Sequence, residues 1–372
     1  MTARRKKFLV KIYGQDGTTL VKNISTSSLG NIPNFTAKMN GIVGPCTFKL
    51  TGDGFRFDSF MEGTAIKHMN IVDVYVMEAA NPLGRRIYRG FISKYSPFYR
   101  QNEQGVEITL LSIGALTSFA YYKNGSSFTV THSTVDTEAI MRAIIDHANT
   151  VFSGSMLSYT ADSTDPVGTN VSITYTDERH FDALEKAFAT AGGEWWWKID
   201  EIGKLYLKDK PATATHTFIL GKHVDEIVGI SDSEKVVNDV QVRGAGGGTS
   251  DDSDATSQAT YGTGSPATGK RSSIVTATEL GDANARTQRA AKEIADNKDA
   301  KVKTSITIND TYDLESIKPG ETCKIRNLGI DNDFFSSNMQ IVSVSYSGYK
   351  AVIEIGDEIA NFASELDSFV NG

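Results

Sequence analysis

The sequence predicts an α+β fold that is mostly β: two antiparallel β-barrel or β-sandwich domains, an α/β insert between them and a short C-terminal helix. Three observations lead to this prediction. Residues 1–118 and 213–356 consist largely of short segments in which apolar and polar residues alternate between turn residues. Over residues 119–212 apolar residues instead recur at helical spacing. A last apolar stripe in helical register lies within residues 357–372.

Composition sets the first limits on function. A chain of 372 residues is long enough for roughly two to four domains. Its 38 basic and 45 acidic residues give a net charge of −7, which argues against a dedicated nucleic-acid binder but is compatible with a channel through which DNA slides. Two isolated cysteines, Cys46 and Cys323, indicate folding in a reducing compartment. No apolar stretch is long enough to span a membrane, and we find no signal peptide.

The first domain, residues 1–118, is predicted from alternating segments. Gly and Asn-Pro turns separate them. The segments begin with Phe8–Ile12 and Cys46–Leu50 and continue with Val72–Val76, Arg85–Tyr95 and Val106–Ile113. Several short strands with regular turns favour a closed or sandwiched antiparallel sheet.

The insert, residues 119–212, is predicted to contain a helix over Asp136–Asn149, a strand over Val171–Thr176 and a second helix over Glu178–Ala191. A hairpin of Glu194–Ile199 and Lys204–Lys208 then turns at Gly203. His147 and His180 lie on the polar flanks of the two helices, which predicts surface positions.

Three consecutive tryptophans stand in the first strand of that hairpin. Side chains alternate along a strand, so Trp195 and Trp197 share one face and Trp196 takes the other. We expect helix 178–191 to cover one face and an interface to cover the other. A carbohydrate platform is the less favoured alternative.

The second β domain, residues 213–356, is predicted to include a strand over Val236–Gly244, a helix over Asp282–Ala300 and a Pro-Gly turn at Lys318–Glu321. The polar, glycine-rich segment Gly244–Gly269 cannot bury enough apolar surface to order itself, so we expect a loop that orders on assembly. Candidate partner contacts are four residues in this loop and one in the hairpin: Asp251, Asp252, Asp254, Tyr261 and Trp196.

No motif in the sequence assigns catalytic, cofactor-binding or metal-binding residues. Gly264–Lys270 has the spacing of a phosphate-binding loop, but Arg271 replaces the Ser or Thr that would bind magnesium. The acids Asp251, Asp252 and Asp254 lack the glycine and glutamate positions of a calcium loop. The six histidines show no metal-ligand spacing.

With these elements in place, nearly the whole chain resembles the tail hub proteins of tailed bacteriophages, including baseplate hubs, tail-tip hubs and the N-terminal hub part of siphophage tail-associated proteins. Five segments carry the resemblance: VDVYV (72–76), GRRIYRGFISKY (84–95), the insert segment Phe181–Pro211, VVNDVQVRG (236–244) and DLESIKPGETCKIRN (313–327). The resemblance implies two tube-protein-like barrels in one chain.

The resemblance also implies a structural role. Three copies would form a homotrimeric ring with pseudo-sixfold symmetry that joins the sixfold tail tube to the threefold tip and surrounds the DNA exit channel. The implied partners are the distal tail protein ring, the tape measure protein and a tip spike or fibre protein. Genome DNA would pass through the lumen without sequence-specific binding. The implied location is the virion tail tip, after folding in the host bacterial cytoplasm.

Two other functions stay open at this point. Many hub relatives continue into a peptidoglycan hydrolase or fibre region, and this sequence ends at Gly372 without one, so we expect no enzyme activity here. A tip-borne cell-wall hydrolase is one alternative. A tail-tip adhesin that binds host-surface glycan through Trp195–Trp197 is the other.

Overall fold

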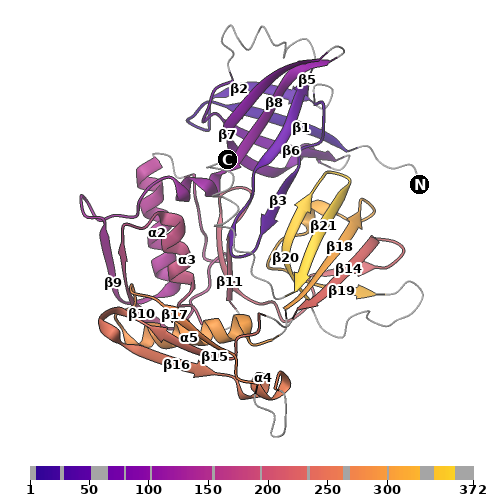
Figure 1. Ribbon diagram of the computed structural model, residues 1–372. Coiled ribbons are helices and arrows are strands. Elements are labelled where there is room, and N and C mark those ends of the chain that lie inside the picture. Colours follow the sequence, from indigo (N-terminus) through magenta and orange to yellow (C-terminus); the bar gives the residue numbers. More distant parts are fainter. Residues whose placement is uncertain are drawn as a thin grey trace.

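The computed structural model describes residues 6–25, 29–51, 66–78, 81–100, 103–152, 156–192, 195–232, 235–262, 269–299, 301–326 and 339–356. The predicted C-terminal helix, 357–372, and most of the segment 264–270 lie outside these ranges. Strands predominate, arranged as two β units with smaller α/β elements beside them (Figure 1). The β units are a curled half-barrel and a nearly closed barrel, so the predicted fold class is confirmed.

The first β unit is a six-stranded antiparallel sheet in the order β2-β1-β6-β7-β8-β5. Its strands are β1 (Lys7–Tyr13), β2 (Leu20–Ser25), β5 (Cys46–Thr51), β6 (Ile71–Glu78), β7 (Asn81–Arg100) and β8 (Glu103–Ser112). The apolar residues that alternate with polar ones in the sequence of β1 are the buried ones: Phe8, Val10 and Ile12 point into the core. All three are nearly inaccessible to solvent.

The second β unit is a seven-stranded sheet in the order β13-β19-β20-β21-β18-β14, with β3 paired to β20. Its strands are β3 (Phe35–Lys38), β13 (His216–Ile219), β14 (Val224–Asp232), β18 (Lys301–Asn309), β19 (Thr322–Arg326), β20 (Met339–Tyr346) and β21 (Lys350–Gly356). Because β3 comes from the N-terminal segment, the two units share backbone hydrogen bonds. Their apolar side chains form one core.

Among the described strands, three pairs are parallel rather than antiparallel. β13 pairs with β19 in parallel, and β15 (Asp239–Arg243) does so with β17 (Ser272–Thr276). The two-residue strand β4 (Gly41–Ile42) also lies parallel to β11 (Trp195–Ile199). In each case the paired strands are far apart in sequence, and no local turn signal marks such a pairing.

The α/β insert follows η3 (Ile113–Ser118). It holds β9 (Thr129–Asp136), α2 (Thr137–Phe152), β10 (Asn170–Thr176), α3 (His180–Phe188), β11 (Trp195–Ile199) and β12 (Leu205–Asp209). Both predicted helices and the hairpin are present, with ends that differ by a few residues. The helices pack their apolar stripes, Ile140, Ile144 and Leu184 among them, into a second core.

The prediction of an unstructured loop over Gly244–Gly269 is wrong for most of its described part. That part contains η4 (Ala245–Gly247), β16 (Thr249–Ser253) and α4 (Ala255–Thr260). Order comes from hydrogen bonds rather than apolar burial. β16 pairs with β15 (Asp239–Arg243), and the Asp254 carboxylate accepts from the Ser257 amide at the start of α4. The fully buried Asn238 side chain donates to the Gly269 carbonyl at 2.9 Å.

The segment from β15 to α5 packs with the insert, although the predicted second domain, residues 213–356, includes it. It contains β17 (Ser272–Thr276) and α5 (Ala283–Asn297), and its buried residues Val240, Val242 and Ala290 belong to the same core as α2 and α3. Figure 1 shows it below those helices, away from β18–β21. The chain thus leaves the second β unit after β14 and returns at β18.

Candidate functional site

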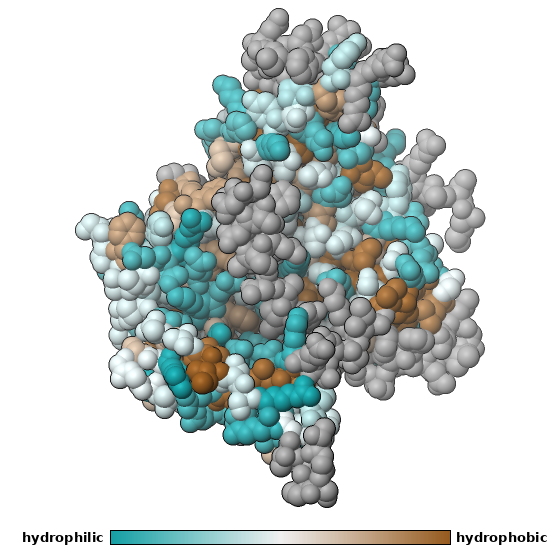
Figure 2. All heavy atoms as spheres, viewed as in Figure 1, coloured by the Kyte–Doolittle hydropathy of each residue, from teal (hydrophilic) through white to brown (hydrophobic). Residues whose placement is uncertain are grey.

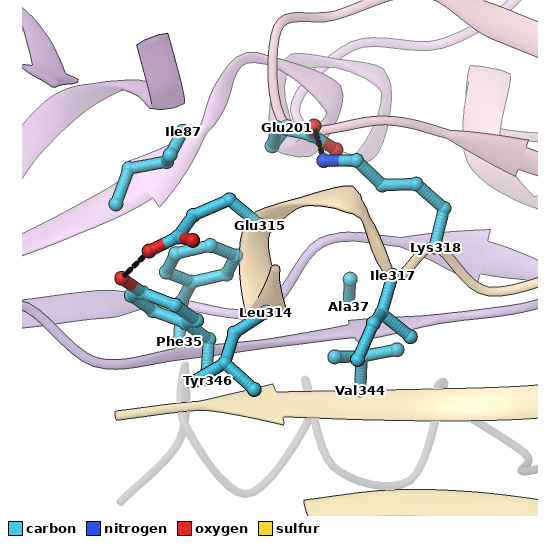
Figure 3. Close-up of a pocket in the computed structure, with 10 residues that line it drawn as sticks. All are labelled: Phe35, Ala37, Ile87, Glu201, Leu314, Glu315, Ile317, Lys318, Val344 and Tyr346. Atoms are coloured by element: carbon cyan, nitrogen blue, oxygen red, sulfur yellow. Dashed lines mark hydrogen bonds and ion pairs between the residues drawn. The ribbon is translucent and has the colours of Figure 1, made fainter. Parts of the chain in front are cut away.

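The two β units and the insert meet at a junction (Figure 3). Its residues come from β3, β7, the turn after β11, the segment around η5 (Leu314–Ser316) and β20. They line a small cavity of about 20 Å³, room for about one water molecule. The junction is therefore packed contact rather than a ligand pocket.

Glu315 is the charged centre of this junction. Its side chain is 2% exposed and accepts hydrogen bonds from Lys6 Nζ at 2.7 Å and from Tyr346 Oη at 2.5 Å. Arg85 Nη2 lies 3.4 Å from the same carboxylate and 2.6 Å from Asp313. Burial and the Glu315 charge raise the pKa of Tyr346 well above its usual value. Lys6 and Arg85 belong to the first β unit and the acids to the second, so these bonds join the two units.

A second charged cluster joins the insert to the second β unit. Lys318 pairs with Glu201, and Lys198 Nζ donates to the Pro319 carbonyl at 2.8 Å. Lys198 is 5% exposed, and burial lowers its pKa. Its ammonium lies over the rings of Trp196, at 5.5 Å, and Tyr206, at 5.3 Å. A buried lysine held this way fixes the hairpin β11–β12 against the turn before β19.

The tryptophans alternate as predicted. Trp197, 1% exposed, packs on the α3 rings Phe181 and Phe188, with centroids 5.9 and 6.4 Å away. Trp196 faces the other way and packs with Met39 and Val342 of the second β unit. The interface expected on that face is thus an internal one. Trp196 is only 6% exposed, so its proposal as an outward partner contact is wrong.

The four loop candidates lie apart from Trp196 and have different surroundings. Asp251 is exposed on β16 and accepts from the Gln241 amide at 3.0 Å, whereas Asp252 is half-buried. Asp254 caps α4 and lies 3.3 Å from Lys298. The half-buried Tyr261 ring lies under the Arg271 guanidinium at 5.7 Å. Asp254 and Tyr261 therefore have structural contacts, and a partner role for Asp251 and Asp252 stays a prediction.

The surface position predicted for His180 is wrong, and His147 is half-buried beside it. His180 is fully buried, and its Nδ1 lies 2.7 Å from the Ala120 carbonyl. Because a carbonyl only accepts, Nδ1 carries the proton, and Nε2 accepts from His147 Nδ1 at 2.7 Å. A second pair lies beside them. Tyr122 Oη is 2.9 Å from His132 Nε2, and the two rings are stacked with their centroids 6.1 Å apart. Helical position alone cannot show that α2 and α3 turn these flanks toward each other.

This cluster predicts acid sensitivity. Burial lowers the pKa of His180 to about 4, and it also lowers the pKa values of His132 and His147, the latter beside Lys123. A lowered folded-state pKa means that the unfolded chain binds the proton more readily. The stability that the neutral, buried histidines contribute is therefore fully present above about pH 6.5 and is lost as the pH falls toward 4. For His180 the loss in free energy of unfolding is up to about 3 kcal/mol.

Urea denaturation at pH 7, 6, 5 and 4 measures this loss. His180→Asn should flatten the profile, while the exposed control His68→Asn should leave it unchanged. A wild-type profile as flat as that of His180→Asn would contradict the assignment.

Within the described residues, no group of three His, Cys, Asp or Glu side chains comes together as a metal site. No helix in the described part of the chain has the length and apolar character needed to cross a membrane. On the face shown in Figure 2, brown apolar atoms form separate spots rather than one continuous patch.

Comparison with known proteins gives the fold a context. Three solved structures superpose over almost their whole length. They are the prophage MuSo2 43 kDa tail protein from Shewanella oneidensis (TM-score 0.63, 16% identity, covering 94% of this chain and 98% of that one), the tail protein from Neisseria meningitidis MC58 (0.61, 10%, 94% and 97%) and prophage tail protein gp18 from Listeria monocytogenes EGD-e (0.60, 10%, 98% and 98%).

The chain has the fold of a prophage tail protein. In addition, residues 212–367 match the family model described as Prophage endopeptidase tail. A search of curated proteins gave no match. The resemblance to phage tail proteins that the sequence suggested is therefore confirmed.

Proposed function

We propose that this prophage-tail-type chain is the hub subunit of a phage tail. Three copies form a closed ring that joins the sixfold tail tube to the threefold tip. The ring surrounds the channel through which DNA leaves, and it lies at the tip of the virion tail after assembly in the bacterial cytoplasm. Its role is structural, without catalysis.

One observation carries this proposal: the two β units of the chain are fixed to each other. β3 extends from the first unit to pair with β20 of the second, with Ala37 opposite Val344. The buried Glu315 then binds Lys6 from the other unit. Two rigidly linked β units per chain give six in a trimer, the number that a sixfold tube presents. This geometry supports a symmetry adaptor.

The remaining partners follow from that position. A hub ring contacts the distal tail protein ring and the end of the tape measure protein on one side, and a spike or fibre protein on the other. DNA passes through without sequence-specific contact, which a chain of net charge −7 favours because like charges do not adhere.

Labelling tests the position. Tails purified from induced cells that carry an affinity tag on this chain should bind gold-labelled antibody at the tip opposite the head. Tails from cells that lack the chain should end without a tip structure. Label along the tube, or complete tails without the chain, would contradict the proposal.

The description of the matched family favours one second candidate, an endopeptidase. The purified chain would then cleave peptide cross-links of cell-wall sacculi, and replacing one acidic residue would abolish cleavage. We expect no release of soluble peptides above that from heat-denatured protein.

A further inference from the structure

The small sheet of β15, β16 and β17 has two outer strands. β15 is central, and in the described residues β16 and β17 each pair with β15 alone. α5 packs on one face of the sheet, where Val240 and Val242 are buried. The other face is turned to solvent. The sheet therefore presents two edges on a fixed support, at the lower end of the molecule in Figure 1.

The register shows which backbone groups point away from the sheet. Gly244 N donates to Gly248 O at 2.8 Å. Because hydrogen-bonded pairs alternate along an antiparallel ladder, the backbone N–H and C=O groups of Ser250 and Asp252 point toward β15. The N–H and C=O groups of Thr249, Asp251 and Ser253 then face outward, although the Asp252 carboxylate accepts from Ser253 N.

The same reasoning applies to β17. Ala277 N donates to Arg243 O at 2.8 Å, which turns Ser273 and Val275 toward β15. The backbone groups of Ser272, Ile274 and Thr276 therefore point outward.

The β17 edge lacks the features that normally keep a sheet edge from pairing. Its sequence, SSIVT, contains no proline and no charge, and its register with β15 shows no bulge. Ile274 is 57% exposed on the solvent face. Edge strands of this kind are templates for an added strand.

The two edges are complementary in charge. Asp251 and Asp252 lie on β16, whereas Lys270 and Arg271 directly precede β17. Suppose that the two edges pair antiparallel with Ser272 opposite Asp251. Arg271 then lies opposite Asp252, Ile274 lies opposite Thr249, and all exposed side chains stay on one face of the sheet. Arg271 and Asp252 are the one pair of opposite charges in this register, since Lys270 already pairs with Asp239 at 2.8 Å, and opposite charges across paired positions stabilise strand pairing.

We propose that β17 of one copy pairs with β16 of the neighbouring copy in this register, so that the small sheets of adjacent subunits join head to tail. The partner is a second copy of this chain, and the inference rests on the proposed ring. A head-to-tail contact of this type generates a closed ring when its rotation closes.

Ile274→Pro tests the contact directly. It removes one outward N–H, and a proline whose missing N–H faces solvent is tolerated at a sheet edge, so the subunit stays folded. Subunit association should weaken about tenfold or more, measured by sedimentation. The matched control Ile274→Ala keeps the N–H and should associate within about threefold of wild type. Equal association of the proline variant and wild type would overturn the proposal.

Cross-linking in assembled tails tests the register without relying on the isolated chain. The two native cysteines are buried, so Ser272→Cys with Asp251→Cys should give covalent dimers and trimers on oxidation. The offset pair Thr276→Cys with Asp251→Cys should give none. Tails that contain the chain but cross-link with neither pair would overturn this contact and leave the hub intact. Tails that do not contain the chain would instead contradict the hub function.

Discussion

Replacing Glu315 by alanine is expected to lower the free energy of unfolding by about 3 kcal/mol, because it removes a buried charge partner from two cations and a tyrosine hydroxyl. Lys6 and Arg85 are partly exposed and regain some hydration, which keeps the loss at the lower end of the range for buried pairs. Urea denaturation at pH 7 measures it.

Asp313 provides the matched control. It binds the same arginine, at 2.6 Å, but its side chain is 52% exposed, so Asp313→Ala should cost less than about 1 kcal/mol. Equal losses for Glu315→Ala and Asp313→Ala would show that the junction does not hold the two β units together.

Trp197→Ala has the largest expected effect, a loss of about 3–5 kcal/mol, because it empties a core position between β11 and α3. The insert should loosen first, since Phe181 and Phe188 lose the ring on which they pack. Denaturation followed by tryptophan fluorescence is ambiguous for this variant, so circular dichroism is the measurement.

Trp195→Ala is the control from the same strand. Trp195 is only partly buried at the edge of that core, so its loss should be about half as large or less. A Trp195→Ala variant as unstable as Trp197→Ala would contradict the assigned packing.

The sequence predicted the elements whose pattern is local. Apolar residues recur every second position in Phe8–Ile12 and at helical spacing in Ile140–Ile145, because each element buries one face. The side chains of Trp195–Trp197 alternate between the two faces, as in any strand. The long-range pairings had no such signal. β3 and β4 are four and two residues long, too short for a period, yet they connect the first β unit to β20 and β11.

The site was harder to predict for two physical reasons. Glu315 stands in a short segment after a turn, and only the folded chain brings Lys6, more than 300 residues away, beside it. The segment after Gly244 has no large apolar residue except Tyr261, so its sequence predicted a loop. Asn238, Asp254 and strand pairing order it through hydrogen bonds instead.

The native mass of the purified chain, with class averages from negative-stain images of the same sample, tests the central claim most directly. The hub predicts about three chain masses and a threefold particle with a central hole. A monodisperse monomer that also fails to form such a particle on isolated tail tubes would contradict the ring.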